Sequence, residues 1–574
     1  MLARALAAGA QGRLVVVLSI LAAAWGAGAA WRQAWVCDDA FISFRYADNL
    51  VHGLGLVYNA GERVEGYSNL LWTLWAALGM RLGARPETWS VAWGAACYAA
   101  TILLLGVRAA GRPLRSGAPA LALPLAAMLA ATHRDWNLFA TSGLETSSFT
   151  FLTLLGYDRL TTAPSTPRRA AIAGFVLALV SLTRPDGMLF AVLGGAFVLG
   201  AMTPRWRCLG AYAGVLLAIT IAAESWRVAY YGDPLPNTYY AKSAQLAWYS
   251  QGWIYVRLYF QKYWVALAGV PLAAIAALAA RRSASAREAL GAASWDREVA
   301  LAALFALGYT FYVLRLGGDF MYARLLIPVT PFYFILLERG LMQLAPRRVL
   351  VQWGVAAAAL AAMILTPQPL GIDQWVSGIV DERQFYTPEA TAKTRAEGAV
   401  LRRFFEGLPV RVAYVGSQAG LMYYSHPEVA IESGTGLTDR FIARQPLAKR
   451  GRIGHEKVAS LDYLVERRRA HLALHYFAGK TLGVDDYLPT AVIGLGGVYA
   501  RALTWDPALM SELRRRGASV PDFLLGLDQY MATMGGRPDA QVRSDYEKLR
   551  HFYFEHVEDP ARERAFRTRL GLGP

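Results

Sequence analysis

The chain has 574 residues, of which 55% are hydrophobic and only 17% charged, against about 25% charged in ordinary soluble domains. Its net charge is +16, but the basic residues gather in short loops between apolar runs, which the positive-inside rule explains without a nucleic-acid partner. The three cysteines, Cys37, Cys97 and Cys208, provide neither a disulfide framework nor a CxxC metal site.

Apolar runs of roughly 15–20 residues recur from residue 14 to about 366, and a bilayer core needs about 20 apolar residues per helix. Residues 1–366 are therefore predicted to form a polytopic α-helical membrane domain, and 367–574, which lack such runs, a soluble domain. The first run, RLVVVLSILAAAWGAGAAW, precedes the bulky WRQAWVCDD, where a cleaved signal peptide would need small residues. It is therefore predicted to be the first transmembrane helix.

The charged loops predict the topology. Basic clusters recur at Arg108/Arg112/Arg115, Arg168/Arg169, Arg205/Arg207, Arg281/Arg282 and Arg347/Arg348. Placing them in the cytoplasm puts residues 36–67, the first external loop, on the outer face. Residues 68–108 break the alternation unless one of their two apolar stretches lies along the membrane surface. We expect about eleven transmembrane helices in the cytoplasmic (inner) membrane, with the C-terminal domain extracytoplasmic.

The soluble domain is predicted to be mixed α/β, because strand-like and helix-like patterns alternate along it. The expected strands are VRVAYVG (410–416), EVAIES (428–433) and HLALHYF (471–477). SQAGLMYYS (417–425) and GHEKVASLDYLVERRRA (454–470) are expected to be helical.

An acidic pair, Asp38 and Asp39, follows the first apolar run. Ionised carboxylates at a membrane boundary are costly unless they face water or a partner, and a helix cap would need only one Asp. The pair is therefore the candidate catalytic centre. The polar segment that follows supplies donors, acceptors and flat rings suited to a hydroxyl-rich ligand, and the candidate binding residues there are Arg45, Tyr46, Asn59, Glu65 and Tyr67.

Three further loops on the same predicted face place a basic residue near an acidic or amide side chain. Arg and Lys are the residues that hold phosphate, so these loops predict a site for an anionic lipid, although each cation alone could be an interfacial snorkelling side chain. The residues are Arg184 and Asp186 in TRPDG, Asn237, Tyr239 and Lys242 in PLPNTYYAK, and Asp319 and Arg324 in GGDFMYAR.

The sequence lacks the complete motifs of zinc proteases and of nucleotide-binding proteins. GHEK (454–457) begins like a zinc-protease motif, but Ala459 stands where the second histidine is needed. The glycine-rich segments match neither a P-loop nor the dinucleotide fingerprint, and short cytoplasmic loops leave no room for a nucleotide-binding domain. A lipid-borne donor is therefore favoured over a sugar nucleotide. No metal site is predicted, although the acidic pair is compatible with a divalent cation.

The motifs DDAFISFRYADNLVHGLGLVYNAGERVEGYSN, ATSGLET, RPDG, YYGDPLPNTYYAK, GGDFM and GRIGHEK together resemble the GT-C glycosyltransferases, and more closely their terminal β-(1→2)-arabinofuranosyltransferase branch of cell-wall arabinan synthesis. The resemblance implies a GT-C transmembrane catalytic domain whose acidic pair maps to Asp38 and Asp39. Glu145 in ATSGLET and His455 in GRIGHEK join the candidate substrate-binding residues. The implied donor is decaprenyl-phosphoryl-arabinose or a related polyprenyl-phosphate sugar.

The expected activity is glycosyl transfer to a hydroxyl of an envelope glycan or glycoprotein. One Asp would act as general base and basic residues would stabilise the departing phosphate. Which Asp is the base, and whether the anomeric configuration is retained or inverted, stay open. The alternatives are a related transferase acting on a protein or another surface polymer, a lipid or solute transporter, and a non-catalytic envelope assembly protein. A transporter would show paired repeats with midplane charges, and no repeat is visible.

Overall fold

A computed structural model describes residues 9–110, 123–282, 292–344, 349–416, 418–447, 449–475 and 492–573. The basic clusters at Arg112 and Arg115 and at Arg347 and Arg348 lie outside the described residues. The chain divides into two compact units, each drawn from several segments. The helical unit comprises Met1–Ser43, Ser68–Pro234 and Ala244–Thr387, and the sheet unit comprises Phe44–Tyr67, Leu235–Ser243 and Pro388–Pro574.

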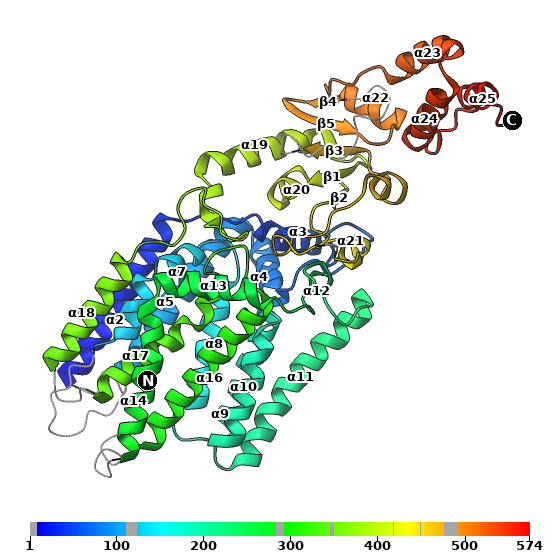
Figure 1. Ribbon diagram of the computed structural model, residues 1–574. Helices are drawn as coiled ribbons and strands as arrows, with labels where there is room; N and C mark the ends of the chain where they lie inside the picture. The colour runs from blue at the N-terminus through cyan, green and yellow to red at the C-terminus, as the bar shows by residue number, and fades with distance from the viewer. Residues whose placement is uncertain are drawn as a thin grey trace. The chain divides into compact units, whose positions relative to one another are not determined.

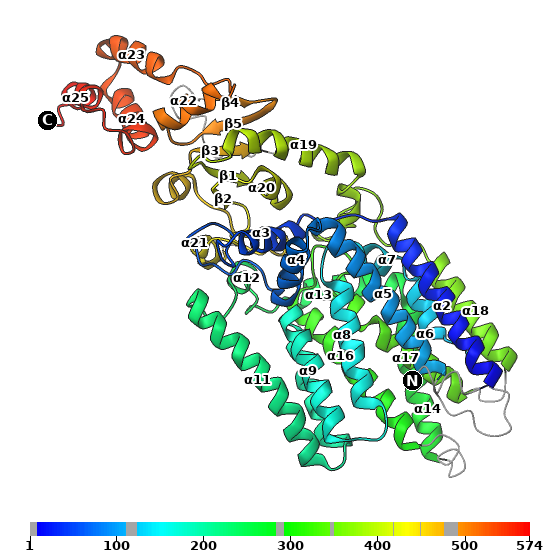
Figure 2. The same ribbon diagram turned by 180° about the vertical axis from the view of Figure 1, so that it is seen from behind.

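The helical unit is a bundle of apolar helices. Neighbouring helices α9, α10 and α11 run side by side, as do α14 and α17 (Figures 1 and 2). The helices are α2 (Gly9–Arg32), α4 (Leu70–Arg81), α5 (Pro86–Ala110), α6 (Leu125–Thr132), α7 (Arg134–Phe139), α8 (Thr146–Thr161), α9 (Pro167–Thr183), α10 (Gly187–Ala201), α11 (Arg205–Tyr231), α13 (Tyr249–Lys262), α14 (Trp264–Arg282), α16 (Ala292–Leu316), α17 (Thr330–Leu344) and α18 (Val349–Leu365), with short turns η1 (Ile327–Val329) and η2 (Glu382–Phe385).

Within the described ranges, four helices are long and apolar enough to cross a membrane, or five if the pair bent by 90° between α13 and α14 is one span. The four are Gly12–Arg32, Pro86–Ala109, Arg205–Tyr231 and Arg297–Leu316, and Gly187–Ala201 and Leu350–Leu365 are shorter apolar helices. The expected count of eleven crossings stays a prediction.

The region that breaks the predicted alternation contains one long and one short helix. Helix α4 has 12 residues, which span about 18 Å, whereas the hydrocarbon core is about 30 Å thick. Helix α5 has 25 residues and is long enough to cross. The structure therefore agrees with the expectation that only one of these two apolar stretches is a full crossing.

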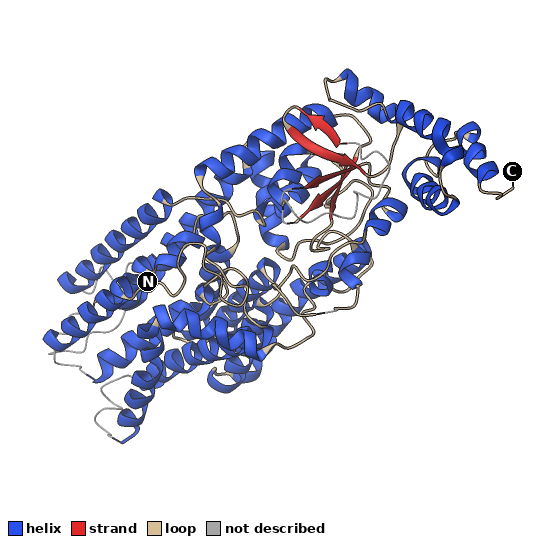
Figure 3. Ribbon diagram, turned by 45° about the horizontal axis from the view of Figure 1, so that its top comes forward, coloured by secondary structure: helices blue, strands red, loops and turns tan. Residues whose placement is uncertain are grey.

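The sheet unit has a five-stranded sheet among its described residues, in the order β2-β1-β3-β5-β4, flanked by helices (Figure 3). Strand β1 (Arg411–Val415) pairs in parallel with β2 (Val429–Glu432) and β3 (Leu472–His475), and β5 (Val498–Ala502) runs antiparallel to both β3 and β4 (Val492–Leu495). The helices of the unit are α12 (Asn237–Ala241), α19 (Pro388–Phe405), α20 (Ala419–Ser425), α21 (Arg440–Arg444), α22 (Pro507–Arg515), α23 (Phe523–Thr533), α24 (Asp539–Leu549) and α25 (Pro560–Arg569), with turns η3 (Tyr463–Arg467), η5 (Met534–Gly536) and η6 (Arg550–Phe554). Helix α3 (Ala40–Val51) contains the first boundary between the units.

The α/β prediction is confirmed for the three strands and for the helix after the first of them, apart from residues 417, 476 and 477, which lie outside the described residues. The helix predicted over 454–470 is confirmed only for residues 461–467, which include the π-helical segment η3, and residues 455–460 before it form no helix. The extended chain delivers Ala459 to the sheet, where its amide donates to the carbonyl of Ser433 at 2.8 Å. Tertiary contact thus overrides the local helical pattern.

The division of the chain differs from the predicted boundary at residue 366. Residues 44–67 and 235–243 belong to the sheet unit, while 367–387 belong to the helical unit. For residues 44–67 the physical reason is pairing of a side chain with the main chain: the side-chain amide of Asn59 donates to the carbonyl of Ala430 at 3.0 Å and accepts from its amide at 2.9 Å. Asn59 therefore extends the hydrogen bonding of strand β2 into the first-loop segment.

Candidate active site

The acidic pair lies in the turn between α2 and α3. The amide of Cys37 donates to the carbonyl of Ser142 at 2.8 Å, and the amide of Phe41 donates to the carbonyl of Asp38 at 3.0 Å. Both Asp38 and Asp39 are half-buried. Hydrogen bonds thus fix the main chain around the pair, while both residues keep part of their surface exposed.

Glu145 is the centre of a buried ionic network in the same unit. Its carboxylate lies 3.2 Å from the guanidinium of Arg324 and 3.8 Å from that of Arg184, and it accepts a hydrogen bond from Asn69 at 3.1 Å. Glu145 is only 3% exposed, at the start of α8. One carboxylate therefore joins two arginines that the sequence places in separate loops.

Each arginine of this network has a second acidic partner. Arg184 donates through two nitrogens to the carboxylate of Asp186, at 3.0 and 2.8 Å, and Arg324 lies 3.6 Å from Asp319. Asp186 also accepts a hydrogen bond from Tyr309. The two predicted phosphate-binding arginines are therefore already paired, and their charges are balanced within the protein.

Each of these arginines also has a buried donor atom that makes no hydrogen bond. Among the described residues, Nη1 of Arg184 and Nε of Arg324 have no hydrogen-bond partner. Buried donors without an acceptor are costly, so an oxygen-rich group that accepts from them would be bound favourably. Because both atoms are buried, a phosphate would accept from them only after the arginine side chains move, while the paired carboxylates balance the positive charge of the network.

Electrostatics connects this network to the acidic pair. Burial disfavours ionisation of Glu145, but Arg324 and Arg184 outweigh it and hold the pKa of that carboxyl below its usual value. Burial lowers the pKa of Arg324, whereas Glu145, Asp319 and then Asp39 raise it, and the net direction is upward. Asp39 thus lies close enough to Arg324 for its charge to act on that guanidinium.

Two residues that the sequence did not single out also belong here. Glu382 is 6% exposed, and the hydroxyl of Tyr386 donates to its carboxylate at 3.2 Å. The Tyr386 ring lies 5.2 Å from the ring of Trp35, three residues before Asp38. They lie beyond the last apolar run, in a segment that sequence reasoning gave to the soluble domain, so no local signal marks them.

The sheet unit holds the rest of the predicted binding residues. Arg45 is 2% exposed and donates to the carbonyls of Tyr58, Met422 and Pro427 at 2.9, 3.0 and 2.9 Å. The guanidinium carbon of Arg45 also lies 5.0 Å from the centre of the Tyr58 ring, in a cation–π contact. The geometry favours a structural role, because the guanidinium is used to tie the first-loop segment to the residues around α20.

The aromatic and acidic residues of the first loop are buried as well. Tyr46, Glu65 and Tyr67 are at most 3% exposed, and the hydroxyl of Tyr46 donates to the carbonyl of Val64 at 2.6 Å. The prediction that these tyrosine rings present flat surfaces to a sugar is therefore wrong. They pack against one another, with the Tyr46 and Tyr67 rings 4.8 Å apart.

The PLPNTYYAK and GRIGHEK segments meet in the sheet unit. Asn237 donates to the carbonyls of Gly436 and Leu437 at 3.0 and 2.8 Å, and Lys242 passes over Gly454, which has φ +79°. His455 follows, and its ring lies 3.3 Å from a main-chain carbonyl two residues before it. Tyr239 is half-buried. The structure thus places the side chain of Lys242 next to Gly454, although the PLPNTYYAK and GRIGHEK motifs are far apart in the sequence.

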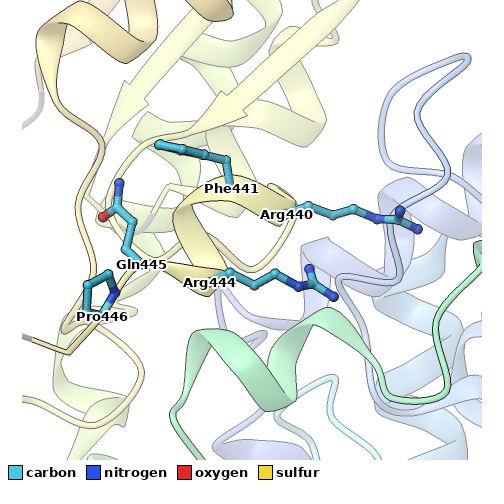
Figure 4. A pocket seen from close by; sticks show the side chains of 5 residues that line it. All are labelled: Arg440, Phe441, Arg444, Gln445 and Pro446. Atoms are coloured by element: carbon cyan, nitrogen blue, oxygen red, sulfur yellow. The ribbon is translucent and has the colours of Figure 1, made fainter.

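A cavity of about 620 Å³ lies over α21 in the same unit, lined by Arg440, Phe441, Arg444, Gln445 and Pro446 (Figure 4). The two arginine side chains point to one side and Phe441 and Gln445 to the other. Arg444 donates to the amide oxygen of Asn237 at 3.3 Å and stacks on the Tyr240 ring at 4.1 Å. This cavity contains none of the predicted site residues.

The predicted site residues therefore fall into two groups. Those of the helical unit are Asp38 and Asp39, the second of which acts electrostatically on Arg324, and the ion-pair network of Glu145, Arg184, Asp186, Asp319 and Arg324. Those of the sheet unit are Arg45, Tyr46, Asn59, Glu65, Tyr67, Asn237, Tyr239, Lys242 and His455. Across the ranges that the structure covers, no group of three or more His, Cys, Asp or Glu side chains is arranged to hold a metal ion.

No family model matches the chain. Two curated proteins do: the terminal beta-(1->2)-arabinofuranosyltransferase of Mycobacterium tuberculosis, 31% identical over 65% of this chain and 66% of its own, and the protein of the same name from Corynebacterium glutamicum, 31% identical over 58% of this chain and 52% of its own. The matched region thus spans between half and two-thirds of the length of these relatives.

Solved structures of ArnT from Cupriavidus metallidurans share the fold. The form bound to undecaprenyl phosphate matches with a TM-score of 0.55 over 87% of this chain and 99% of that chain, at 15% identity. The apo form matches with a TM-score of 0.54 over 86% and 98%, at 14% identity. The chain therefore has the GT-C fold of a polytopic helical membrane protein, and its resemblance to the terminal β-(1→2)-arabinofuranosyltransferases is confirmed.

Proposed function

We propose that the chain is a membrane glycosyltransferase that moves a sugar, D-arabinofuranose, from a polyprenyl-phosphate donor to a hydroxyl of a cell-envelope glycan. The observation that carries this proposal is the half-buried Asp38–Asp39 pair beside the Arg324–Glu145–Arg184 network, within a helical unit of GT-C fold. The names of both curated relatives support the sugar, and the lipid in one ArnT structure supports the class of donor.

The proposed reaction forms one bond and breaks another at the anomeric carbon. The acceptor oxygen attacks that carbon as Asp38 or Asp39 removes the hydroxyl proton, and the bond from the anomeric carbon to the phosphate oxygen breaks. Polyprenyl phosphate leaves with the bonding electrons. Positive charge that develops on the sugar in the transition state is stabilised by the second carboxylate, as it is in glycoside hydrolysis.

The arginine network would hold the departing phosphate. Charge increases on the phosphate as the bond breaks, so donors already fixed in position stabilise the transition state more than the ground state. Arg184 and Arg324 both lie against Oε1 of Glu145, which would set the direction of their other donor atoms. In this scheme Asp186 and Asp319 hold the outer ends of the arginines.

The proposed location is the cytoplasmic membrane, with the site and the sheet unit on the outer face. A lipid-linked donor is consistent with that side, because it requires no soluble nucleotide sugar. The sheet unit would then be available to an extracytoplasmic acceptor, an envelope glycan. A glycosyltransferase of the same class that acts on a protein or another surface polymer is the alternative, since the chain matches only part of its curated relatives.

A donor competition in proteoliposomes tests the proposal. The purified protein receives radiolabelled polyprenyl-phosphate arabinose or a polyprenyl-phosphate hexose, with an arabinan oligosaccharide or a glycoprotein as acceptor. Transfer of arabinose to the oligosaccharide is expected, with little from the hexose donors. Transfer of hexose alone would refute the sugar assignment, transfer to the glycoprotein alone would refute the acceptor, and no transfer from any donor would refute the enzyme itself.

A further inference from the structure

The segment before the sheet unit is paired with the loop that carries two of the site residues. The amide of Val380 donates to the carbonyl of Phe320 at 2.9 Å, and the amide of Tyr322 donates to the carbonyl of Val380 at 3.0 Å. These bonds form an isolated parallel bridge between Met321 and Val380. Residues 376–386 are therefore held beside the loop of Asp319 and Arg324 by main-chain hydrogen bonds.

A second tie fixes the short turn that follows. Asp381 caps η2, because its carboxylate accepts from the amide of Arg383 at 3.3 Å. The same carboxylate lies 2.9 Å from the guanidinium of Arg134, which is also 2.7 Å from Asp135. The position of η2 is thus set from both sides, by the bridge and by this ionic contact.

The turn packs directly onto the residues that precede the acidic pair. The ring of Tyr386 lies 5.2 Å from the ring of Trp35, and the guanidinium carbon of Arg383 lies 5.9 Å from that ring. The indole nitrogen of Trp35 donates to the carbonyl of Leu138 at 2.9 Å. Trp35 is therefore held between η2 and α7. A displacement of η2 would also displace Trp35 and the segment that leads from it to Asp38.

Glu382 and Tyr386 lie on and next to this turn, and Tyr386 is close enough to Asp38 and Asp39 for their charges to act on its phenol. The phenol of Tyr386 donates to the carboxylate of Glu382 at 3.2 Å. Burial, followed by Cys37, Asp38, Glu382 and Asp39, raises the pKa of the phenol well above its usual value. The phenol therefore stays protonated at any working pH and remains a hydrogen-bond donor among these carboxylates.

We propose that Glu382 and Tyr386 are positioning residues of the reaction centre, with the Tyr386 phenol holding the Glu382 carboxylate toward Asp38 and Asp39. The inference rests on the proposed glycosyl transfer. It assigns to the site a third carboxylate, which favours proton uptake by the neighbouring base and stabilises the cationic transition state of the sugar.

Two conservative variants test the inference. Glu382→Gln removes the charge and Tyr386→Phe removes only the hydroxyl, so both keep the packing on Trp35. In each we expect kcat to fall roughly ten- to hundredfold, with the donor KM within about twofold of wild type, because the loss is of transition-state positioning. In Glu382→Gln the acid limb of the pH–rate profile should move to lower pH, because a negative charge near the base is gone.

The chain supplies a matched control pair. The hydroxyl of Tyr546 donates to the carboxylate of Glu563 at 2.9 Å in the sheet unit, between α24 and α25. Tyr546→Phe and Glu563→Gln make the same chemical changes, so any general effect on folding should appear there too. We expect these controls to keep the wild-type kcat and pH profile, and Glu382→Asp to recover part of the activity that Glu382→Gln loses.

The outcomes separate the two proposals. Wild-type kcat and pH profile in both test variants, in a protein that transfers sugar and is inactivated by substitution of the acidic pair, would overturn the inference and leave the function standing. No transfer by wild type would overturn the function and, with it, the inference. If Glu382→Gln shows no melting transition and is therefore unfolded, Tyr386→Phe alone tests the inference, because it removes only one oxygen atom.

Discussion

Replacing Glu145 by glutamine removes the one negative charge that Arg184 and Arg324 share. At an effective dielectric constant of 20, its attraction to Arg324 at 3.2 Å is about 5 kcal/mol and to Arg184 at 3.8 Å about 4 kcal/mol. Most of this attraction offsets the cost of burying the charges. Removing one partner of such a buried network typically lowers the free energy of unfolding by about 3–5 kcal/mol. We expect Glu145→Gln to destabilise the helical unit by about 3 kcal/mol, because the amide keeps its contact with Asn69.

The measurement is the melting temperature of the purified protein in detergent, followed over pH. The folded-state pKa of Glu145 is depressed, so its stabilisation is complete above the unfolded value near 4.5 and is lost as pH falls through the folded value. The wild-type and Glu145→Gln melting temperatures should therefore differ at pH 7 and converge below pH 4.5. Glu512→Gln, which removes an exposed partner of Arg515 and Arg516, is the control and should leave the melting temperature unchanged.

A double-mutant cycle separates the pair energy from the burial of a single charge. Arg324→Gln alone should also destabilise the protein, and the double variant Glu145→Gln/Arg324→Gln should be less destabilised than the sum of the single variants. Additive effects, or a Glu145→Gln melting temperature equal to wild type at pH 7, would refute the reasoning that this carboxylate holds the arginines.

Other substitutions test the packing of each unit. Arg45→Met should destabilise the sheet unit by about 3 kcal/mol or more and increase its proteolysis, because three buried hydrogen bonds from the guanidinium to main-chain carbonyls are lost; wild-type protease resistance would contradict the structural role. Gly252→Ala should lower the melting temperature by several degrees, since its Cβ would clash with the carbonyl of Leu314 where α13 meets α16. Gly214→Ala on α11 is the matched control, because nothing lies within 4 Å of its added Cβ, and it should be neutral or stabilise by up to about 1 kcal/mol. Equal effects in the two glycine variants would refute the packing argument.

The sequence was most informative where a residue's role depends on local context. The apolar runs, the alternating strands near residues 411, 429 and 472, and the acidic pair at a helix end all follow from periodicity and burial cost. The pairing of Glu145 with two arginines could not be predicted, because its partners lie 39 and 179 positions along the chain and no local pattern encodes that contact.

The first external loop, residues 36–67, is where residue composition gave the wrong interpretation. Its tyrosines and Arg45 have the composition of a ligand site, yet they are buried because strand β2 and helix α20 supply partners hundreds of residues later. Composition alone cannot tell a polar cluster that binds a ligand from one that joins two segments of a fold. Glu382 and Tyr386 were missed for the converse reason, since their position depends on long-range contacts, the bridge between Met321 and Val380 and the ion pair of Asp381 with Arg134.

The most direct test of the central claim is sugar transfer by Asp38→Asn and Asp39→Asn. Each variant is reconstituted in liposomes with radiolabelled polyprenyl-phosphate arabinose and an arabinan oligosaccharide, and its folding is checked by melting temperature. We predict that wild type transfers the label and that loss of the general base lowers the rate by roughly 10²–10⁴-fold in at least one variant that still folds. Wild-type rates in both folded variants would contradict the assignment of the acidic pair as the catalytic centre.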